Sequence, residues 1–179
     1  MNKQPVIWDP LIRIFHWSLS TAFLLNYWVL EEGDDLHEWV GYYVLAALAL
    51  RLVWGFIGPD NARFRSFFPT PSKVRHHISA MLAGKEPLYE GHNPLGGAMI
   101  ICLIVMMALT GISGWMMTTD ALWGEEWVEE VHEIFANVSM LLVAVHIPVV
   151  VWFSKFGERN LIRQMITGRK ADNIKKAFN

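Results

Sequence analysis

The chain has 179 residues and a formal net charge of −2; 53% of the residues are hydrophobic and 18% are charged. A soluble helical protein would need more charge to cover its surface, so this composition favours a single domain embedded in a membrane. The only cysteine, Cys102, excludes an internal disulfide, a four-cysteine iron–sulfur cluster and a C-x-x-C-H motif for covalent haem.

Four apolar segments are long enough to cross a bilayer, which takes roughly 20 residues. They cover residues 11–30, 37–57, 95–118 and 131–153 and predict an all-α, four-helix up-and-down bundle in one domain, residues 1–179. The residues ahead of the first segment lack a cleavage signal and are interpreted as a juxtamembrane lead-in. The proline-rich loop of residues 58–94 contains SKVRHHISAMLAGK, which predicts a short amphipathic helix at the membrane interface. The basic tail of residues 155–179 is expected to begin as a helix.

The charges predict how the bundle is oriented. All fifteen Lys and Arg fall in the lead-in, the long loop, the tail or the span ends that face them. The other two connections carry only acidic charges: Glu31, Glu32, Asp34, Asp35 and Glu38, then Asp120, Glu125, Glu126, Glu129, Glu130 and Glu133. Because basic residues gather on the cytoplasmic side of a membrane, both termini are predicted to be cytoplasmic.

Four of the seven histidines lie in the predicted spans, at two depths. His16 and His146 lie near the cytoplasmic face, whereas His37 and His132 open their spans near the outer face. The fourteen residues from His132 to His146 turn a helix through about 1400°, within roughly 40° of the starting direction, and rise about 21 Å. Both imidazoles therefore point to nearly the same side of one helix, and the same spacing separates His37 from Arg51.

Small residues accompany these histidines. The stretches LHEWVGY and VHEIFAN both place His-Glu at the start of a span and a small residue, Gly41 or Ala136, one turn later, which makes room for a flat ligand beside an imidazole. The third segment has no histidine, but its stretch ALTGISGW offers Gly111, Ser113 and Gly114 for close helix packing.

Each depth therefore offers two imidazoles from different helices. A metal site closed by protein takes three or four ligands at one level, whereas a haem iron takes two, because the porphyrin supplies four nitrogens. We predict two non-covalent b-type haems, one held by His16 and His146 and the other by His37 and His132. The alternative is a bundle in which the histidines are structural and bind neighbouring helices through hydrogen bonds.

Other polar residues have two interpretations each. Arg51 either pairs with a haem propionate or extends to the cytoplasmic interface. His76 and His77 either protonate a bound quinone or form a wet basic face beside lipid headgroups. His92 either belongs to a functional loop motif or serves as a turn or cap before the third span.

Several stretches together resemble the bacterial cytochrome b561 family, which is grouped with the cytochrome b subunits of nickel–iron hydrogenases. They are RIFHWSL, LHEWVGYYVLAALALRLVWG, GHNPLGGAMIICLIVMMALTGISGW and the two histidines of the last span. The resemblance covers roughly residues 5–170. It implies a four-helix haem bundle that moves electrons between the quinone pool and a partner, and its ligand positions fall on His16, His37, His132 and His146.

The sequence therefore predicts transmembrane electron transfer in a bacterial inner membrane. The expected partners are membrane lipid, the quinone pool and a periplasmic c-type cytochrome or other redox protein, which the acidic outer loops can attract; no nucleic-acid partner is expected, and the oligomeric state is open. One alternative is a haem quinone oxidoreductase that acts directly on a small oxidant such as superoxide. A second alternative is a haem-free membrane anchor.

Overall fold

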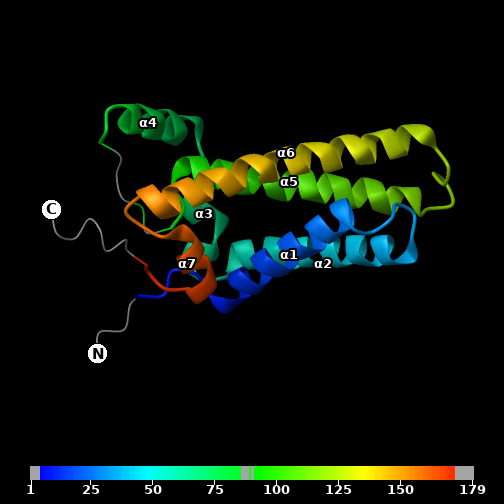
Figure 1. The fold of residues 1–179 in the computed structure, drawn as a ribbon, viewed down its shortest axis with the longest axis horizontal. Coiled ribbons are helices and arrows are strands. Elements are labelled where there is room, and N and C mark those ends of the chain that lie inside the picture. Colours follow the sequence, from blue (N-terminus) through cyan, green and yellow to red (C-terminus); the bar gives the residue numbers. More distant parts are fainter. Residues whose placement is uncertain (1–4, 86–88, 90, 172–179) are drawn as a thin grey trace. The chain divides into compact units, whose positions relative to one another are not determined.

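The computed structural model describes residues 5–85, 89 and 91–171. Their helices are α1 (Pro10–Trp28), α2 (Asp35–Ile57), the 3-10 helix η1 (Asp60–Ala62), α3 (Phe64–Phe67), α4 (Pro71–Leu82), α5 (Pro94–Met117), α6 (Glu126–Phe156) and α7 (Leu161–Thr167) (Figure 1). These residues form no β-strand beyond one isolated bridge between Val6 and Arg169. The predicted all-α class is confirmed. Residues 86–88 and 90 of the predicted loop and 172–179 of the predicted tail lie outside the described residues.

Capping residues explain where two of the long helices begin. The Asp9 carboxylate accepts hydrogen bonds from the backbone N–H groups of Leu11 and Ile12, at 3.0 and 3.1 Å, ahead of α1. The Asn93 side chain accepts one from the Gly96 N–H at 2.7 Å, ahead of α5. A proline opens each of these helices, where its missing N–H costs nothing. Both helices therefore start one residue before the predicted spans.

Three of the described helices are long and apolar enough to cross a membrane, namely α2, α5 and α6. The helix α1, predicted as a fourth span, is not among them, since it carries Arg13, His16 and Asn26. The helix α6 starts at Glu126, earlier than predicted, and continues through Pro148. Membrane crossing by α1 stays a prediction.

The chain divides into two compact units. Unit 1 contains the described residues of Met1–Arg13, Trp54–Ile101 and Val145–Asn179, and unit 2 contains Ile14–Val53 and Cys102–Ala144. Each of the four long helices contributes one segment to each unit.

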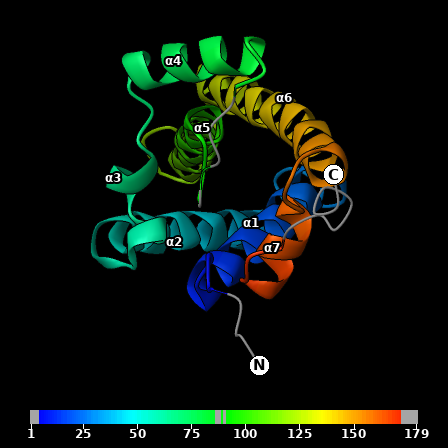
Figure 2. The ribbon, with the colours of Figure 1, turned by 90° about the vertical axis from the view of Figure 1, so that its left-hand side faces the viewer.

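In unit 2, segments of α1, α2, α5 and α6 are joined by side-chain hydrogen bonds, and α5 runs beside α6 (Figure 1 and Figure 2). The bonds link Asn26 to the His37 carbonyl at 3.0 Å, Tyr42 to Thr118 at 3.0 Å, Thr110 to Ser139 at 3.3 Å and Tyr27 to Asn137 at 2.6 Å. They connect α1 to α2, α2 to the end of α5, α5 to α6, and α6 back to α1. Because exposed polar groups are costly in an apolar environment, these bonds fix how the four segments pack.

In unit 1, the N-terminal segment packs against α7 (Figure 2). The N–H groups of Ile7 and Trp8 donate to the Gly168 carbonyl at 2.8 and 3.1 Å, and the Arg13 guanidinium donates to the Ile166 carbonyl at 2.6 Å. Gly168 ends α7 with a φ of 74°, a left-handed conformation that favours glycine. The helix predicted at the start of the basic tail is thereby confirmed.

Candidate metal centres

Unit 2 brings His37 of α2 and His132 of α6 together. Their ring centroids lie 6.4 Å apart, with 69° between the ring planes, and both side chains are half-buried. Two imidazoles that bind one metal ion from opposite sides, each through a bond of about 2 Å, have ring centres roughly 6 Å apart. The separation of this pair therefore suits one metal ion between the rings.

The ring of His132 is held by α5. Its Nδ1 lies 2.9 Å from the Thr110 carbonyl oxygen and 3.2 Å from the Ser113 hydroxyl. A carbonyl oxygen only accepts hydrogen bonds, so Nδ1 carries the proton and donates it. The lone pair of the neutral imidazole then lies on Nε2, the nitrogen available to a metal.

Two features of the α5 sequence make this contact possible. The Ser113 hydroxyl donates to the Leu109 carbonyl at 2.8 Å, which leaves its oxygen free to accept from His132. At Gly114, an added Cβ would lie 3.0 Å from Cε1 of His132 and 3.3 Å from Nδ1. Glycine therefore lets the imidazole rest against the α5 backbone. The sequence predicted helix packing at these positions but not their contact with His132.

The other side of the pair is less constrained. Asn26 of α1 fixes the start of α2 through the His37 carbonyl, and the buried Nδ1 of His37 has no hydrogen-bond partner among the described residues. One turn further along α2, a Cβ added to Gly41 would meet no atom within 4 Å. This space fits the predicted room for a flat ligand beside His37.

The predicted residues of the second level belong to different units. His16 and Arg51 lie in unit 2, and His146 lies in unit 1. Arg51 is only 4% exposed, which does not fit a side chain extended to the interface. His16 and His146 are half-buried, and His146 shares the continuous helix α6 with His132. Their pairing stays a prediction.

The remaining histidines of unit 1 correct two interpretations. His77 is fully buried, with its ring 5.5 Å from that of Tyr89, so it forms no wet basic face; only His76 is exposed. The ring of His92 lies 4.4 Å from that of Trp8 and also packs on Phe67. The cap of α5 is Asn93 rather than His92.

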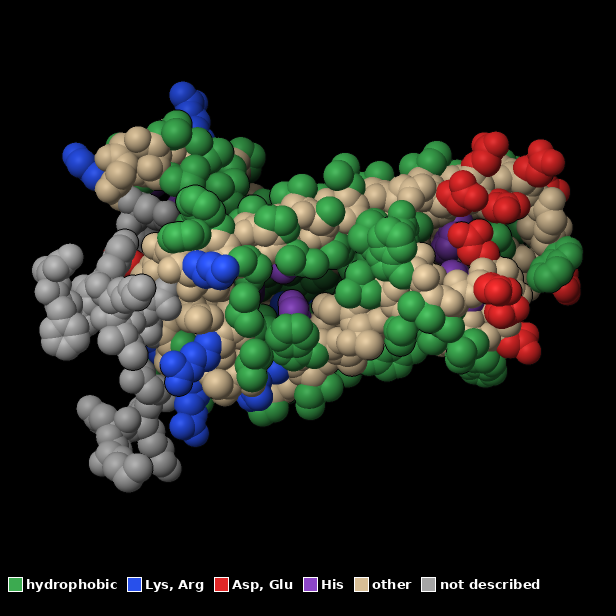
Figure 3. All heavy atoms as spheres, in the orientation of Figure 1, with side chains coloured by type: hydrophobic (Ala, Val, Ile, Leu, Met, Phe, Trp, Pro, Cys, Tyr) green, Lys and Arg blue, Asp and Glu red, His purple; other side chains and the backbone are tan. Residues whose placement is uncertain are grey.

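Acidic side chains gather on unit 2 around the start of α6 and the connection between α1 and α2 (Figure 3). They are the predicted outer carboxylates, and nearly all are exposed. No Lys or Arg occurs between residues 14 and 50 or between 86 and 154 of the sequence. The surface beside the His37–His132 pair is therefore strongly negative.

The model of the family described as "Prokaryotic cytochrome b561" matches residues 7–168. The chain belongs to this family. It is also 22% identical, over an alignment 216 positions long, to a protein of Rhizobium leguminosarum bv. viciae named "Probable Ni/Fe-hydrogenase B-type cytochrome subunit", with 95% of this chain and 90% of that protein covered. No solved structure matches the chain. The family resemblance seen in the sequence is confirmed, and with it a role in electron transport with haem b and transmembrane helices.

The His37–His132 pair fits a haem on the donor chemistry of its own residues. It offers two imidazoles at a suitable separation, one with its tautomer fixed by α5 and one beside an open helix face at Gly41. Apolar exposed side chains cover the surrounding helices, as expected for a chain that faces lipid.

Proposed function

We propose that the chain is a di-haem b-type cytochrome of the bacterial cytoplasmic membrane that moves electrons between the quinone pool and a periplasmic redox partner. In this proposal residues 1–179 form one four-span domain, with α1 as the fourth span and both termini cytoplasmic. Family membership supports electron transfer in a membrane. The observation that carries the haem assignment is the His37–His132 pair.

At the outer level, His37 and His132 would hold one haem through their imidazoles. When bound, haem b supplies a one-electron couple between ferric and ferrous iron. The Thr110 carbonyl and Ser113 keep the His132 imidazole in one tautomer and one orientation. The pair lies on α2 and α6, two helices apolar enough to cross a membrane, where bulk water would be kept away from it.

At the inner level, His16 and His146 would hold the second haem. This assignment is supported by sequence depth and by the fourteen-residue spacing from His132 along α6, which corresponds to about 21 Å of helix. Arg51 lies fourteen residues after His37, so it belongs to the inner level, and its buried guanidinium suits a haem propionate.

The outer partner is a basic redox protein, such as a c-type cytochrome. The acidic side chains around the start of α6 support this, because a negative surface raises the rate at which a cationic partner arrives. The relative reported above is named as a subunit of a nickel–iron hydrogenase, which also supports a protein partner.

A haem count with histidine variants tests the proposal. The purified protein should yield two acid-extractable haems per chain by pyridine haemochrome, with low-spin spectra. In redox titrations, His37→Ala and His132→Ala should lose one component, whereas His16→Ala and His146→Ala should lose the other. One haem per chain would exclude a haem at the inner level. No haem would exclude both haem sites and leave a haem-free membrane anchor as the remaining interpretation. Loss of the same component in His132→Ala and His146→Ala would contradict the two-level assignment.

A further inference from the structure

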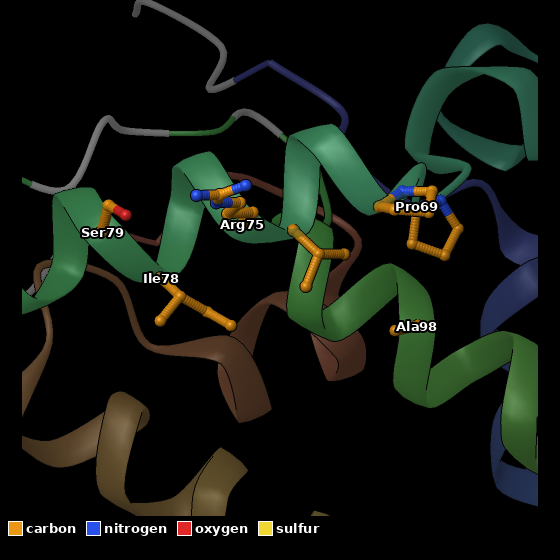
Figure 4. A pocket seen from close by; sticks show the side chains of 7 residues that line it. Pro69, Arg75, Ile78, Ser79 and Ala98 are labelled. Carbon is orange, nitrogen blue, oxygen red and sulfur yellow. The ribbon is translucent and has the colours of Figure 1, made fainter.

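An open groove lies in unit 1 between α4 and the first turns of α5, outside the histidine pairs. Its volume is about 520 Å³, within the range of roughly 300–1,000 Å³ of small-molecule sites. The lining residues are Pro69, Pro71, Val74, Arg75, Ile78, Ser79 and Ala98. Figure 4 shows Arg75 and Ile78 on α4 and Ala98 on the neighbouring α5.

The groove combines one cation with apolar walls. Val74 and Ile78 lie one turn apart on α4 and provide apolar lining, and Arg75 is exposed beside them. The same helix ends with Leu82, which is 80% exposed although it is a large apolar residue. Exposed apolar residues on a basic amphipathic helix are typical of a helix that lies in the plane of a membrane interface.

The depth of the groove agrees with that placement. Ala98 lies four residues after the first residue of α5, about 6 Å along a helix able to span the membrane. The first turns of a helix that spans a bilayer lie in its interfacial region, where lipid headgroups meet their acyl chains.

The stretch of sequence that contains α4 carries only basic charges. Residues 61–85 hold Arg63, Arg65, Lys73, Arg75 and Lys85 and no Asp or Glu. Asp60, just before this stretch, binds Arg65 at 3.0 Å and lies 3.6 Å from Arg63. Neither Lys73 nor Arg75 forms an ion pair with a carboxylate of the described residues. The cation that lines the groove is therefore available to an anion from outside the chain.

We propose that this groove binds one anionic phospholipid. Arg75 binds the headgroup phosphate, and Val74, Ile78 and Ala98 contact the first part of an acyl chain. Basic pockets beside membrane helices on the cytoplasmic side bind anionic headgroups in this way. An acyl chain is needed because most of the lining is apolar.

Native mass spectrometry of the full-length haem-loaded protein tests the proposal, with phosphatidylglycerol and phosphatidylcholine titrated into the micelles. One phosphatidylglycerol should be retained more tightly than phosphatidylcholine, and Arg75→Gln should weaken its retention about five-fold, the effect of one basic residue near an anionic surface. Lys85→Gln is the matched control, since it removes the same charge from the same basic stretch outside the groove. It should change retention far less.

A second variant separates the groove from general surface charge. Ala98→Phe fills the groove from α5 without changing any charge and should also weaken phosphatidylglycerol retention, while an unchanged haem spectrum shows that the fold is intact. Glycerol phosphate, which lacks acyl chains, should not displace the lipid. Equal losses in Arg75→Gln and Lys85→Gln, equal retention of both lipids, displacement by glycerol phosphate, or full retention in Ala98→Phe would each overturn the proposal.

Discussion

The hydrogen bond from His132 to Ser113 leads to a prediction about the redox potential of the proposed outer haem. A hydrogen bond accepted from Nδ1–H makes an imidazole more basic and a stronger donor to iron. A stronger donor stabilises the more positive ferric state. Replacing Ser113 with Ala removes this acceptor, so the midpoint potential of the outer haem should rise.

The structure sets the size of the shift. The Thr110 carbonyl, at 2.9 Å, remains after the substitution, and the lost contact at 3.2 Å is the longer of the two. A single hydrogen bond of this kind contributes about 0.5–1 kcal/mol, and one electron carries about 59 mV for each tenfold change in equilibrium constant. The expected rise is therefore about 20–40 mV, confined to one of the two redox components.

Potentiometric titration of the visible spectrum measures this shift. Ser139→Ala is the matched control, because Ser139 is also a fully buried serine at the α5–α6 contact but binds the Thr110 hydroxyl rather than His132. It should leave both potentials unchanged. A fall in potential, no change, or an equal shift in Ser139→Ala would refute the role assigned to Ser113.

Three further predictions concern other parts of the site. Gly114→Ala places a Cβ 3.0 Å from the His132 ring and should displace it, so the outer haem should be depleted in the pyridine haemochrome assay; wild-type content would contradict the contact. Arg51→Gln removes a buried cation and should lower the midpoint potential of the inner haem by about 40 mV or more, and Arg51→Lys should lower it by a smaller amount. A shift in the potential of the outer haem instead would place Arg51 at the outer level. Neutralising the acidic residues at the start of α6 should slow electron transfer to a basic cytochrome about ten-fold at low salt, as measured by stopped flow. The effect should be far smaller at 0.15 M salt, where the Debye length is about 8 Å and the attraction is screened. A rate of electron transfer that does not depend on salt would exclude electrostatic steering. The residues changed are Glu125, Glu126, Glu129 and Glu130.

The length of the apolar runs predicts α2, α5 and α6. The capping side chains of Asp9 and Asn93 explain why α1 and α5 begin one residue before the predicted spans. The early start of α6 at Glu126 is harder to predict from the sequence than the apolar part of the helix, because its first turn is acidic and joins an apolar span to an exposed loop. The length of an apolar run predicts the part of a helix that can cross a membrane. The helix itself can extend beyond that run, because it continues for as long as its backbone hydrogen bonds do.

The environment of individual histidines is harder to predict. Sequence depth pairs His37 with His132, and the structure places their rings close together. The sequence does not predict the burial of His77, whose neighbours include the ring of Tyr89 from the loop after α4. Contacts of this kind come from loop segments that have no periodic pattern.

The third predicted span shows that residue types alone do not reveal everything that a helix contributes to a site. It has no histidine, yet its backbone provides the shortest hydrogen bond to His132 through the carbonyl of Thr110. A backbone carbonyl is present at every residue, so no sequence pattern marks it. The sequence does contain the residues that let an imidazole reach this carbonyl, because Gly114 allows the imidazole to approach and Ser113 supplies a second acceptor. Since no side-chain substitution removes the carbonyl, the tautomer of His132 is fixed by the fold, and Ser113 is the side chain through which its donor strength can be adjusted.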